Sequence, residues 1–432
     1  MRAGPYDRTV GERPVDNAVT CEVPRRSRPV ADPHADAGPR SAWARGIAAA
    51  GLCLLLASTG CGGPSGADSA KADVQHLLDR RSTALLGHDE TTYAVTGTRT
   101  DYTRLRALPL ASWTYRVTAV RDTAAGATAD ADLSYRVAGY DTAPVDARRT
   151  LTLGRTADGK WYVSADRPAE EAGQQLWDQG PVTVVQGAHS LVLGTGRTTG
   201  ELRAYAGLAD RAVPAVSRAW GTDWSRRVVV LVPRSLDDMA GLLGSPAANY
   251  RGIAAVTTGE VGGSGQAPAD RVVVNPDAYA ALGDLGKQVV LTHETTHVAT
   301  RAHTTAATPL WLSEGYADWI GYLGTGRTPT EAAPELTRSV QDGRAPAALP
   351  ADKDFGFTSD PTKLAQAYES GWLACRMIAD QWGTARLGAF YRAVGAHAQR
   401  AGAVEDALKK TLGTTQEAFT AQWQAYVRAQ LG

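Results

Sequence analysis

The chain has 432 residues, and its 45 Lys and Arg residues balance its 45 Asp and Glu residues. This neutrality excludes a basic nucleic-acid-binding protein, which needs an excess of positive charge. Hydrophobic residues make up 43% of the chain, which excludes wholesale disorder, and the length predicts two or three domains of roughly 100–200 residues each.

The segment from Arg45 to Cys61 has the features of a bacterial lipoprotein signal. A positive charge precedes a short apolar run, and the small residues 58–60 precede the cysteine. The apolar run is shorter than the roughly 20 residues that span a bilayer. We therefore expect residues 1–61 to be a leader, Cys61 to be lipidated, and the exported protein to be anchored on the outer side of the membrane. Alternatives are secretion, an uncleaved anchor and a buried hairpin.

The first 44 residues are rich in Pro, Arg and Asp and show no periodicity. Such a long extension is unusual in front of a signal peptide, which indicates a misassigned start within residues 1–44. Once the leader is removed, Cys375 is the only thiol besides Cys61. No disulfide can then form between thiols of the mature chain, and Cys375 is interpreted as a buried core residue.

Residues 62–70 are predicted to be a tether, and residues 71–178 an α+β domain. Apolar residues recur at helical spacing from Asp73 to about Leu86. Alternating apolar and polar residues then predict four antiparallel strands, at 113–120, 129–137, 149–153 and 160–164. The helix and sheet resemble the cone of nuclear-transport-factor-like domains. The resemblance implies that the cone can form a ligand pocket. Because no cluster of catalytic residues occurs in this segment, a spacer or recognition role is favoured over a catalytic one.

The second domain is predicted from residue 182 to residue 432. Its first half mixes strands and helices, and from Leu285 onward the pattern is almost entirely helical. Strands are predicted at 182–185, 190–193, 228–232 and 271–275, helices at 200–220 and 236–243, and a Gly-rich loop at 259–265. The fold class of the whole chain is therefore α+β.

A metal-binding pattern lies in the helix predicted after Gly286. His293 and His297 stand four residues apart, and Glu294 follows the first of them. Positions i and i+4 share one helix face, so both imidazoles can reach a single Zn²⁺ at about 2.1 Å. The neighbouring carboxylate then lies beside the water on the open side of the ion, where it can act as a general base. The pattern predicts one zinc ion per chain.

The third metal ligand is either His303 or Glu314. A ligand at His303 needs a sharp turn of the chain, for which metzincin peptidases use a glycine, but the β-branched Thr300 occupies that place. Glu314 and Asp318 lie one turn apart on the next predicted helix. One carboxylate can therefore bind the metal while the other accepts the N–H of a ligating histidine, and this favours Glu314.

The two motifs together carry a family resemblance. His293-Glu294-x-x-His297, followed by Trp311-Leu312-Ser313-Glu314-Gly315-Tyr316-Ala317-Asp318, resembles the gluzincin zinc metallopeptidases, in particular the peptidase MA-like domains. The resemblance implies a small sheet in front of a helical region. It also implies that the strand at 271–275 is an edge strand that pairs with extended substrate. A core strand is the other interpretation.

A further segment, Ala367-Tyr368-Glu369-Ser370-Gly371, looks like the tyrosine-bearing helix of aminopeptidase N-type enzymes. That resemblance implies that Tyr368 is a catalytic residue that stabilises the tetrahedral intermediate. The Gly-x-Met-Glu-Asn motif, by which those enzymes hold a substrate amino terminus, is absent. Exopeptidase activity is therefore not implied.

The sequence thus predicts an extracytoplasmic zinc peptidase that acts on a peptide or protein substrate. Zinc would activate a water, Glu294 would take its proton, and a peptide bond would be hydrolysed. The alternative is a catalytically silent binding lipoprotein of the cell envelope that uses the peptidase fold as a scaffold. Cleavage of peptides that depends on Glu294 separates the two.

Overall fold

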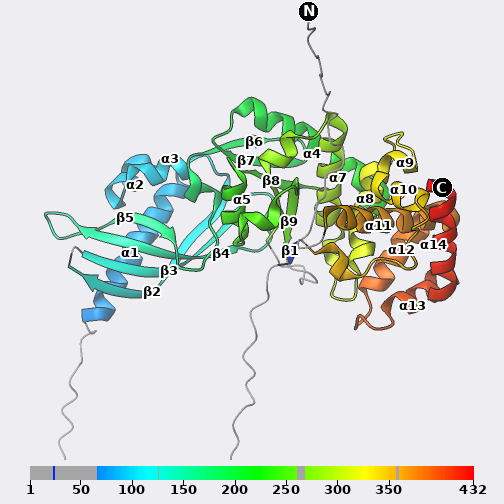
Figure 1. Cartoon of the computed structure of the whole chain (residues 1–432). Coiled ribbons are helices and arrows are strands. Elements are labelled where there is room, and N and C mark those ends of the chain that lie inside the picture. The colour runs from blue at the N-terminus through cyan, green and yellow to red at the C-terminus, as the bar shows by residue number, and fades with distance from the viewer. Residues whose placement is uncertain (1–22, 25–65, 125, 260–267, 357–359) are drawn as a thin grey trace, which may run out of the picture.

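The computed structural model describes residues 23–24, 66–124, 126–259, 268–356 and 360–432. Three parts follow one another along the molecule: a front α+β part, a central six-stranded sheet with its helices, and a helical rear part (Figure 1). The predicted leader apart from Val23–Pro24, with Cys61, lies outside the described residues, as do residues 62–65 of the predicted tether and most of the Gly-rich loop. Residues 66–70, predicted as tether, are helical and belong to the first helix. Within the described ranges, no helix combines the length and apolarity needed to cross a bilayer.

The front part confirms the predicted helix followed by an antiparallel sheet. The sheet is a four-stranded meander in the order β2-β3-β4-β5, and buried residues alternate along β3 and β4 as the sequence pattern requires. Its elements are α1 (Gly66–Leu86), α2 (Glu90–Thr96), α3 (Arg99–Leu105), β2 (Leu110–Thr123), β3 (Gly126–Val137), β4 (Val145–Arg155), β5 (Trp161–Pro168) and the short 3₁₀ helix η1 (Leu176–Gln179).

The central part is a mixed sheet in the order β1-β9-β10-β8-β7-β6. Its strands are β1 (Val23–Pro24), β6 (Val182–Gln186), β7 (Ser190–Thr195), β8 (Val228–Val232), β9 (Ala255–Gly259) and β10 (Arg271–Val274). Its helices are α4 (Thr199–Trp220), α5 (Leu236–Leu243), η2 (Ala247–Tyr250) and α6 (Pro276–Ala280). Because β10 lies between β8 and β9, the prediction of an edge strand at 271–275 is wrong. The strand next to the edge is β9, whose outer side pairs only with the two residues of β1 in the described chain.

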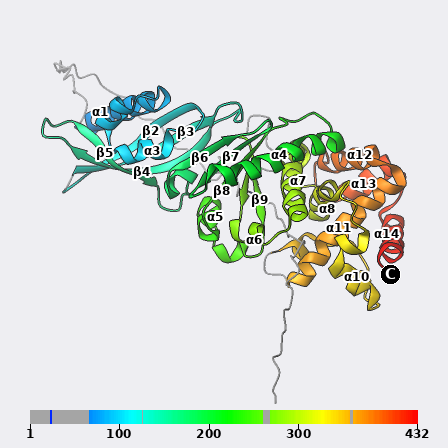
Figure 2. The ribbon, with the colours of Figure 1, turned by 90° about the horizontal axis from the view of Figure 1, so that it is seen from above.

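The two faces of this sheet pack against different parts of the molecule. Val228, Val230 and Val232 of β8 pack with residues of α4 and of α7 (Asp284–Thr300), the helix that carries the predicted metal ligands His293 and His297. Val229 and Leu231 alternate with them and pack with the core of the front part. One apolar core therefore continues from the front sheet onto the central sheet, and Figure 2 shows the two parts side by side.

A buried ion pair also joins the front and central parts. Both carboxylate oxygens of Asp141, which follows β3, accept hydrogen bonds from the Arg271 guanidinium at 2.9 and 2.8 Å. Asp141 also accepts the backbone N–H groups of Val137 and Ala269. These bonds fix the turn after β3 against β10.

The rear part is helical, as predicted. It comprises η3 (Arg301–His303), α8 (Leu310–Tyr322), α9 (Pro329–Ala332), α10 (Pro334–Gln341), η4 (Asp352–Phe355), α11 (Pro361–Trp382), α12 (Thr384–Gly395), α13 (Ala403–Ala407), the π-helical turn η5 (Leu408–Leu412) and α14 (Gln416–Leu431). Cys375 on α11 is fully buried, as expected for a core thiol.

Helices α8 and α11 cross at two glycines. A Cβ atom built on Gly315 would lie 2.3 Å from the backbone of Gly371, and one built on Gly371 would lie 2.6 Å from the carbonyl oxygen of Trp311. Any larger residue would separate the backbones. Since Glu314 precedes Gly315, this close crossing also sets the position of the predicted metal ligand.

Candidate metal centre

Helix α7 presents His293 and His297 on one face, as the i, i+4 spacing predicts. The helix packs against α4, α8 and β9, and twelve of its residues are buried. His293, Glu294 and His297 each expose 2% or less of their surface, and Glu314 on α8 exposes 1%. The four side chains therefore lie in an interior where electrostatic interactions are strong.

Three of these side chains converge. Among the residues that the structure describes, His293, His297 and Glu314 are the group of His, Cys, Asp and Glu side chains close enough to hold a metal ion. The two Nε2 atoms are 2.9 Å apart, and Glu314 Oε2 lies 3.3 Å from His293 Nε2 and 3.5 Å from His297 Nε2. The structure thus brings together the two histidines and the favoured third ligand.

The spacing of these three atoms fits a tetrahedral zinc site. Ligands at about 2.0–2.1 Å from a tetrahedral ion lie about 3.3 Å from one another, close to the observed distances. Neither carboxylate oxygen of Glu314, although buried, has a hydrogen-bond partner in the described part of the chain. A buried carboxylate is costly without a cation or donors, so the donor set suits Zn²⁺.

Asp318 orients one of the histidines. Its Oδ1 lies 2.7 Å from His293 Nδ1, so Nδ1 carries the proton and Nε2 points toward His297 and Glu314. Burial lowers the pKa of His293, but the Asp318 carboxylate, aided by Glu314 and Glu294, raises it to about 10. The surrounding carboxylates therefore favour positive charge at this place.

The histidines act on the acids in turn. Burial raises the pKa of Glu314, but the two histidines lower it by more, so that the pKa falls below its ordinary value to about 2. This carboxyl group is therefore ionised. Burial raises the pKa of Asp318, and the neighbouring His293 opposes that rise.

Glu294 lies beside the three ligands and is held by the sheet. Thr257 of β9 donates its hydroxyl to Glu294 Oε2 at 2.5 Å and to the Glu294 backbone carbonyl at 3.2 Å. The other oxygen, Oε1, is buried and accepts no hydrogen bond from the described residues. Burial raises the pKa of Glu294, while His293 and His297 lower it. One oxygen is thus fixed and the other remains able to take a proton.

Two further residues were candidates for the site, His303 as a metal ligand and Tyr368 as a catalytic residue. His303 lies in η3 with its ring against Trp220, at 5.5 Å between centroids, and is not part of the converging group. Tyr368 is buried on α11, one turn before Gly371, with its ring edge against Phe355. It therefore belongs to the helix that packs against the Glu314 helix.

Thr257 was missed by sequence reasoning. A threonine within a strand carries no motif, and its contact with Glu294 spans 37 residues of sequence. In the folded structure, the alternation of side chains along β9 directs Thr257 toward α7, but β9 lies next to α7 only because of the order of strands in the sheet. No signal in the sequence could have found it.

Comparisons with known proteins give distant matches only. No protein-family model and no curated protein sequence matches the chain. Native yeast LTA4 hydrolase is 14% identical with a TM-score of 0.36, over 64% of this chain and 43% of that one. A two-domain M1 zinc metallopeptidase bound to L-arginine is 14% identical with a TM-score of 0.33, over 74% and 61%.

An M1 zinc metallopeptidase from Deinococcus radiodurans is 15% identical with a TM-score of 0.31, over 65% of this chain and 59% of that one. The present chain therefore spans from 43% to 61% of the length of these three proteins. At such low identity and TM-score, a function has to be inferred from the residues of this chain itself.

Proposed function

We propose that this chain is a zinc-dependent peptidase that hydrolyses peptide bonds, with one Zn²⁺ held by His293, His297 and Glu314. The observation that supports the proposal is the convergence of these three donors, with the buried Glu294 carboxylate held beside them by Thr257. Two imidazoles and one carboxylate form the ligand set of catalytic zinc sites that keep a position open for substrate.

When bound, Zn²⁺ supplies a Lewis acid that polarises the scissile carbonyl and lowers the pKa of a water to about 7. Glu294 takes the proton of the attacking water on Oε1, the oxygen without a hydrogen bond, and returns it to the leaving amine. Thr257 keeps the other oxygen of Glu294 in place throughout. Asp318 keeps the proton of His293 on Nδ1, so that Nε2 is available as a ligand.

Tyr368 is proposed to donate its hydroxyl to the carbonyl oxygen as negative charge develops there. The protein is proposed to work outside the cytoplasm, with the lipidated Cys61 anchoring it to the membrane. Its partner is proposed to be a peptide or protein substrate, because a water activated by zinc together with a carboxylate base is suited to the hydrolysis of an amide bond.

Replacement of Glu294 by Gln tests the proposal. Gln keeps the size of the side chain but cannot act as a base, so Glu294→Gln should retain zinc and lose turnover by at least about 100-fold. Glu417→Gln, an exposed position on α14, is the matched control and should cleave like the parent.

Both variants and the parent are incubated with a proteome-derived peptide library, with and without a chelator. Cleavage products that require both zinc and Glu294 support the proposal. The same products from the parent and from Glu294→Gln, or no products from either zinc-loaded protein, would contradict it.

A further inference from the structure

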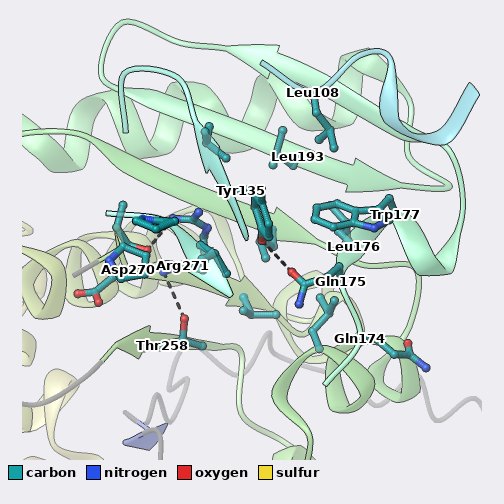
Figure 3. Close-up of a pocket in the computed structure, with 18 of the residues that line it drawn as sticks. Leu108, Tyr135, Gln174, Gln175, Leu176, Trp177, Leu193, Thr258, Asp270 and Arg271 are labelled. Carbon is teal, nitrogen blue, oxygen red and sulfur yellow. Dashed lines mark hydrogen bonds between the residues drawn. The ribbon is translucent and has the colours of Figure 1, made fainter. Parts of the chain in front are cut away.

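A cavity of about 310 Å³ lies between the front sheet and the central sheet. Figure 3 shows Tyr135 and Trp177 on one side of it and Thr258, Asp270 and Arg271 on the other. Its apolar walls come from both parts of the molecule and include Leu108, Leu110, Val137, Leu193, Leu231 and Leu242. The size is within the range of sites for small ligands.

The cavity is connected to the candidate metal centre through β9. Thr257 faces α7, where its hydroxyl binds Glu294, whereas the next residue, Thr258, lines the cavity. Successive side chains of a strand point to opposite faces of the sheet. One face of β9 therefore adjoins the catalytic groups and the other adjoins the cavity.

The outer edge of β9 can pair with an extended chain. In the described residues it pairs with Val23–Pro24, in the register Val23 to Thr258 and Pro24 to Gly259. This two-residue pairing lies in the predicted leader and is short enough to be replaced by a longer strand. A peptide lying there would alternate like β9, with one set of side chains toward the metal centre and the other toward the cavity.

The chemistry of the cavity selects for an apolar side chain. The rings of Tyr135 and Trp177 meet edge to face at 5.0 Å between centroids, and the Tyr135 hydroxyl donates to Gln175. Three charged side chains of the described residues line the cavity. Arg271 is bonded to Asp141 and Asp270 to Arg301, whereas Asp146 stands at an exposed position of β4. A charged ligand would find no free counter-ion among these pairs, whereas an aromatic or large aliphatic group would bury its surface.

We propose that this cavity is the specificity pocket for a large apolar or aromatic side chain of a peptide bound along the outer edge of β9. The inference rests on the proposed peptidase function and names the substrate class of that site. It predicts cleavage at a fixed distance from a Phe, Tyr, Trp or Leu residue. Recognition would come from the front part of the molecule, because Tyr135 and Trp177 belong to it.

Filling the cavity tests this pocket. Leu242→Trp on α5 places a larger side chain into the cavity, and Leu110→Trp does so from the front sheet. Leu243→Trp is the matched control, since Leu243 is the next residue of the same helix but does not line this cavity. The full chain and each variant are profiled on the peptide library, and kcat and KM are measured for a peptide pair that differs only by Phe or Ala at the selected position.

The parent should prefer the Phe peptide by about 10- to 100-fold in kcat/KM, the range for burying one large apolar side chain. Leu242→Trp and Leu110→Trp should reduce this preference at least tenfold through KM, while both still cleave the Ala peptide. Leu243→Trp should behave like the parent.

The binding step is measured separately in the Glu294→Gln variant, where the Phe peptide should bind at least tenfold more tightly than the Ala peptide. Glu294-dependent cleavage without an apolar preference, or a preference unchanged in both filled variants, would overturn this pocket and leave the peptidase function standing. A complete absence of Glu294-dependent cleavage would overturn the peptidase function, and the substrate pocket with it.

Discussion

Replacing Gly315 by Ala should disturb both the fold and the metal centre. The new Cβ atom would lie 2.3 Å from the carbonyl carbon and oxygen of Gly371, whereas ordinary contact begins at 3.4 Å. The obstacle is backbone, which cannot rotate away, so α8 and α11 must move apart by about 1 Å. We expect the free energy of unfolding to fall by about 1–3 kcal/mol, the usual cost of overpacking a core.

The same movement should weaken zinc binding. Glu314 directly precedes Gly315, and metal–ligand distances tolerate changes of only about 0.2 Å. We therefore expect at least about a tenfold loss of zinc affinity, measured by competition with a chromophoric chelator, while urea unfolding reports stability. Gly207→Ala on α4 is the control, since its Cβ would meet only an ordinary 3.7 Å contact and alanine favours a helix. Parent-like stability and zinc affinity in Gly315→Ala would refute the reasoning about the helix crossing.

Three further predictions concern charged groups. Asp141→Ala should destabilise the protein by about 3–5 kcal/mol in urea unfolding, because it leaves buried Arg271 without its carboxylate. Asp132→Ala, which removes the partly exposed partner of the exposed Arg116, should cost less than about 1 kcal/mol, and equal effects of the two substitutions would contradict this role of burial. Burial raises the pKa of Glu369 to about 8, although the backbone N–H groups of Glu335 and Leu336, at the start of α10, donate hydrogen bonds to its carboxyl group and lower this pKa. The native state therefore favours the protonated acid. The stabilisation by protonated Glu369 is complete below pH 4.5 and is lost as the pH rises to about 8. Over this range the free energy of unfolding of Glu369→Gln should therefore rise relative to that of the parent by about 1 kcal/mol per pH unit. A difference between the two proteins that does not change with pH would contradict this prediction. Asp318→Asn should weaken zinc binding by about 10- to 100-fold in chelator competition, and unchanged affinity would show that Asp318 does not orient the histidine.

Local patterns were sufficient to predict most elements of this fold. Alternation located the strands of the front sheet, and β8 and α5 have the predicted bounds. The i, i+4 spacing of His293 and His297 predicted their common face, because it depends only on helix geometry. Thr300 in place of the glycine that a ligand at His303 needs, and the one-turn spacing of Glu314 and Asp318, favoured Glu314 over His303. Glu314 is the side chain that lies with the two histidines in the described residues.

Features that depend on the order of strands could not be predicted. The strand β10 lies inside the sheet because it pairs with β8 on one side and, antiparallel, with β9 on the other. The contact between Thr257 and Glu294 and the ion pair between Asp141 and Arg271 span 37 and 130 residues of sequence. Pairings over such distances leave no periodic signal, so both were found only in the folded structure.

The apolar core that continues from the front part into the central part also depends on how distant strands come together. The sequence predicted two domains with a boundary near residue 180, where the composition changes. Val229 and Leu231 of β8 nevertheless pack with the front sheet. An alternating strand with two apolar faces indicates burial on both sides, but it does not identify the partner of each face.

The central claim is that His293, His297 and Glu314 hold one zinc ion. It is tested most directly by the zinc content of the full chain after loading and desalting, compared with that of Glu314→Ala and of Glu417→Ala. We predict one zinc per chain in the parent and in Glu417→Ala, and less than about a tenth of that in Glu314→Ala. A parent without zinc, or a Glu314→Ala variant that retains the full amount, would contradict the account.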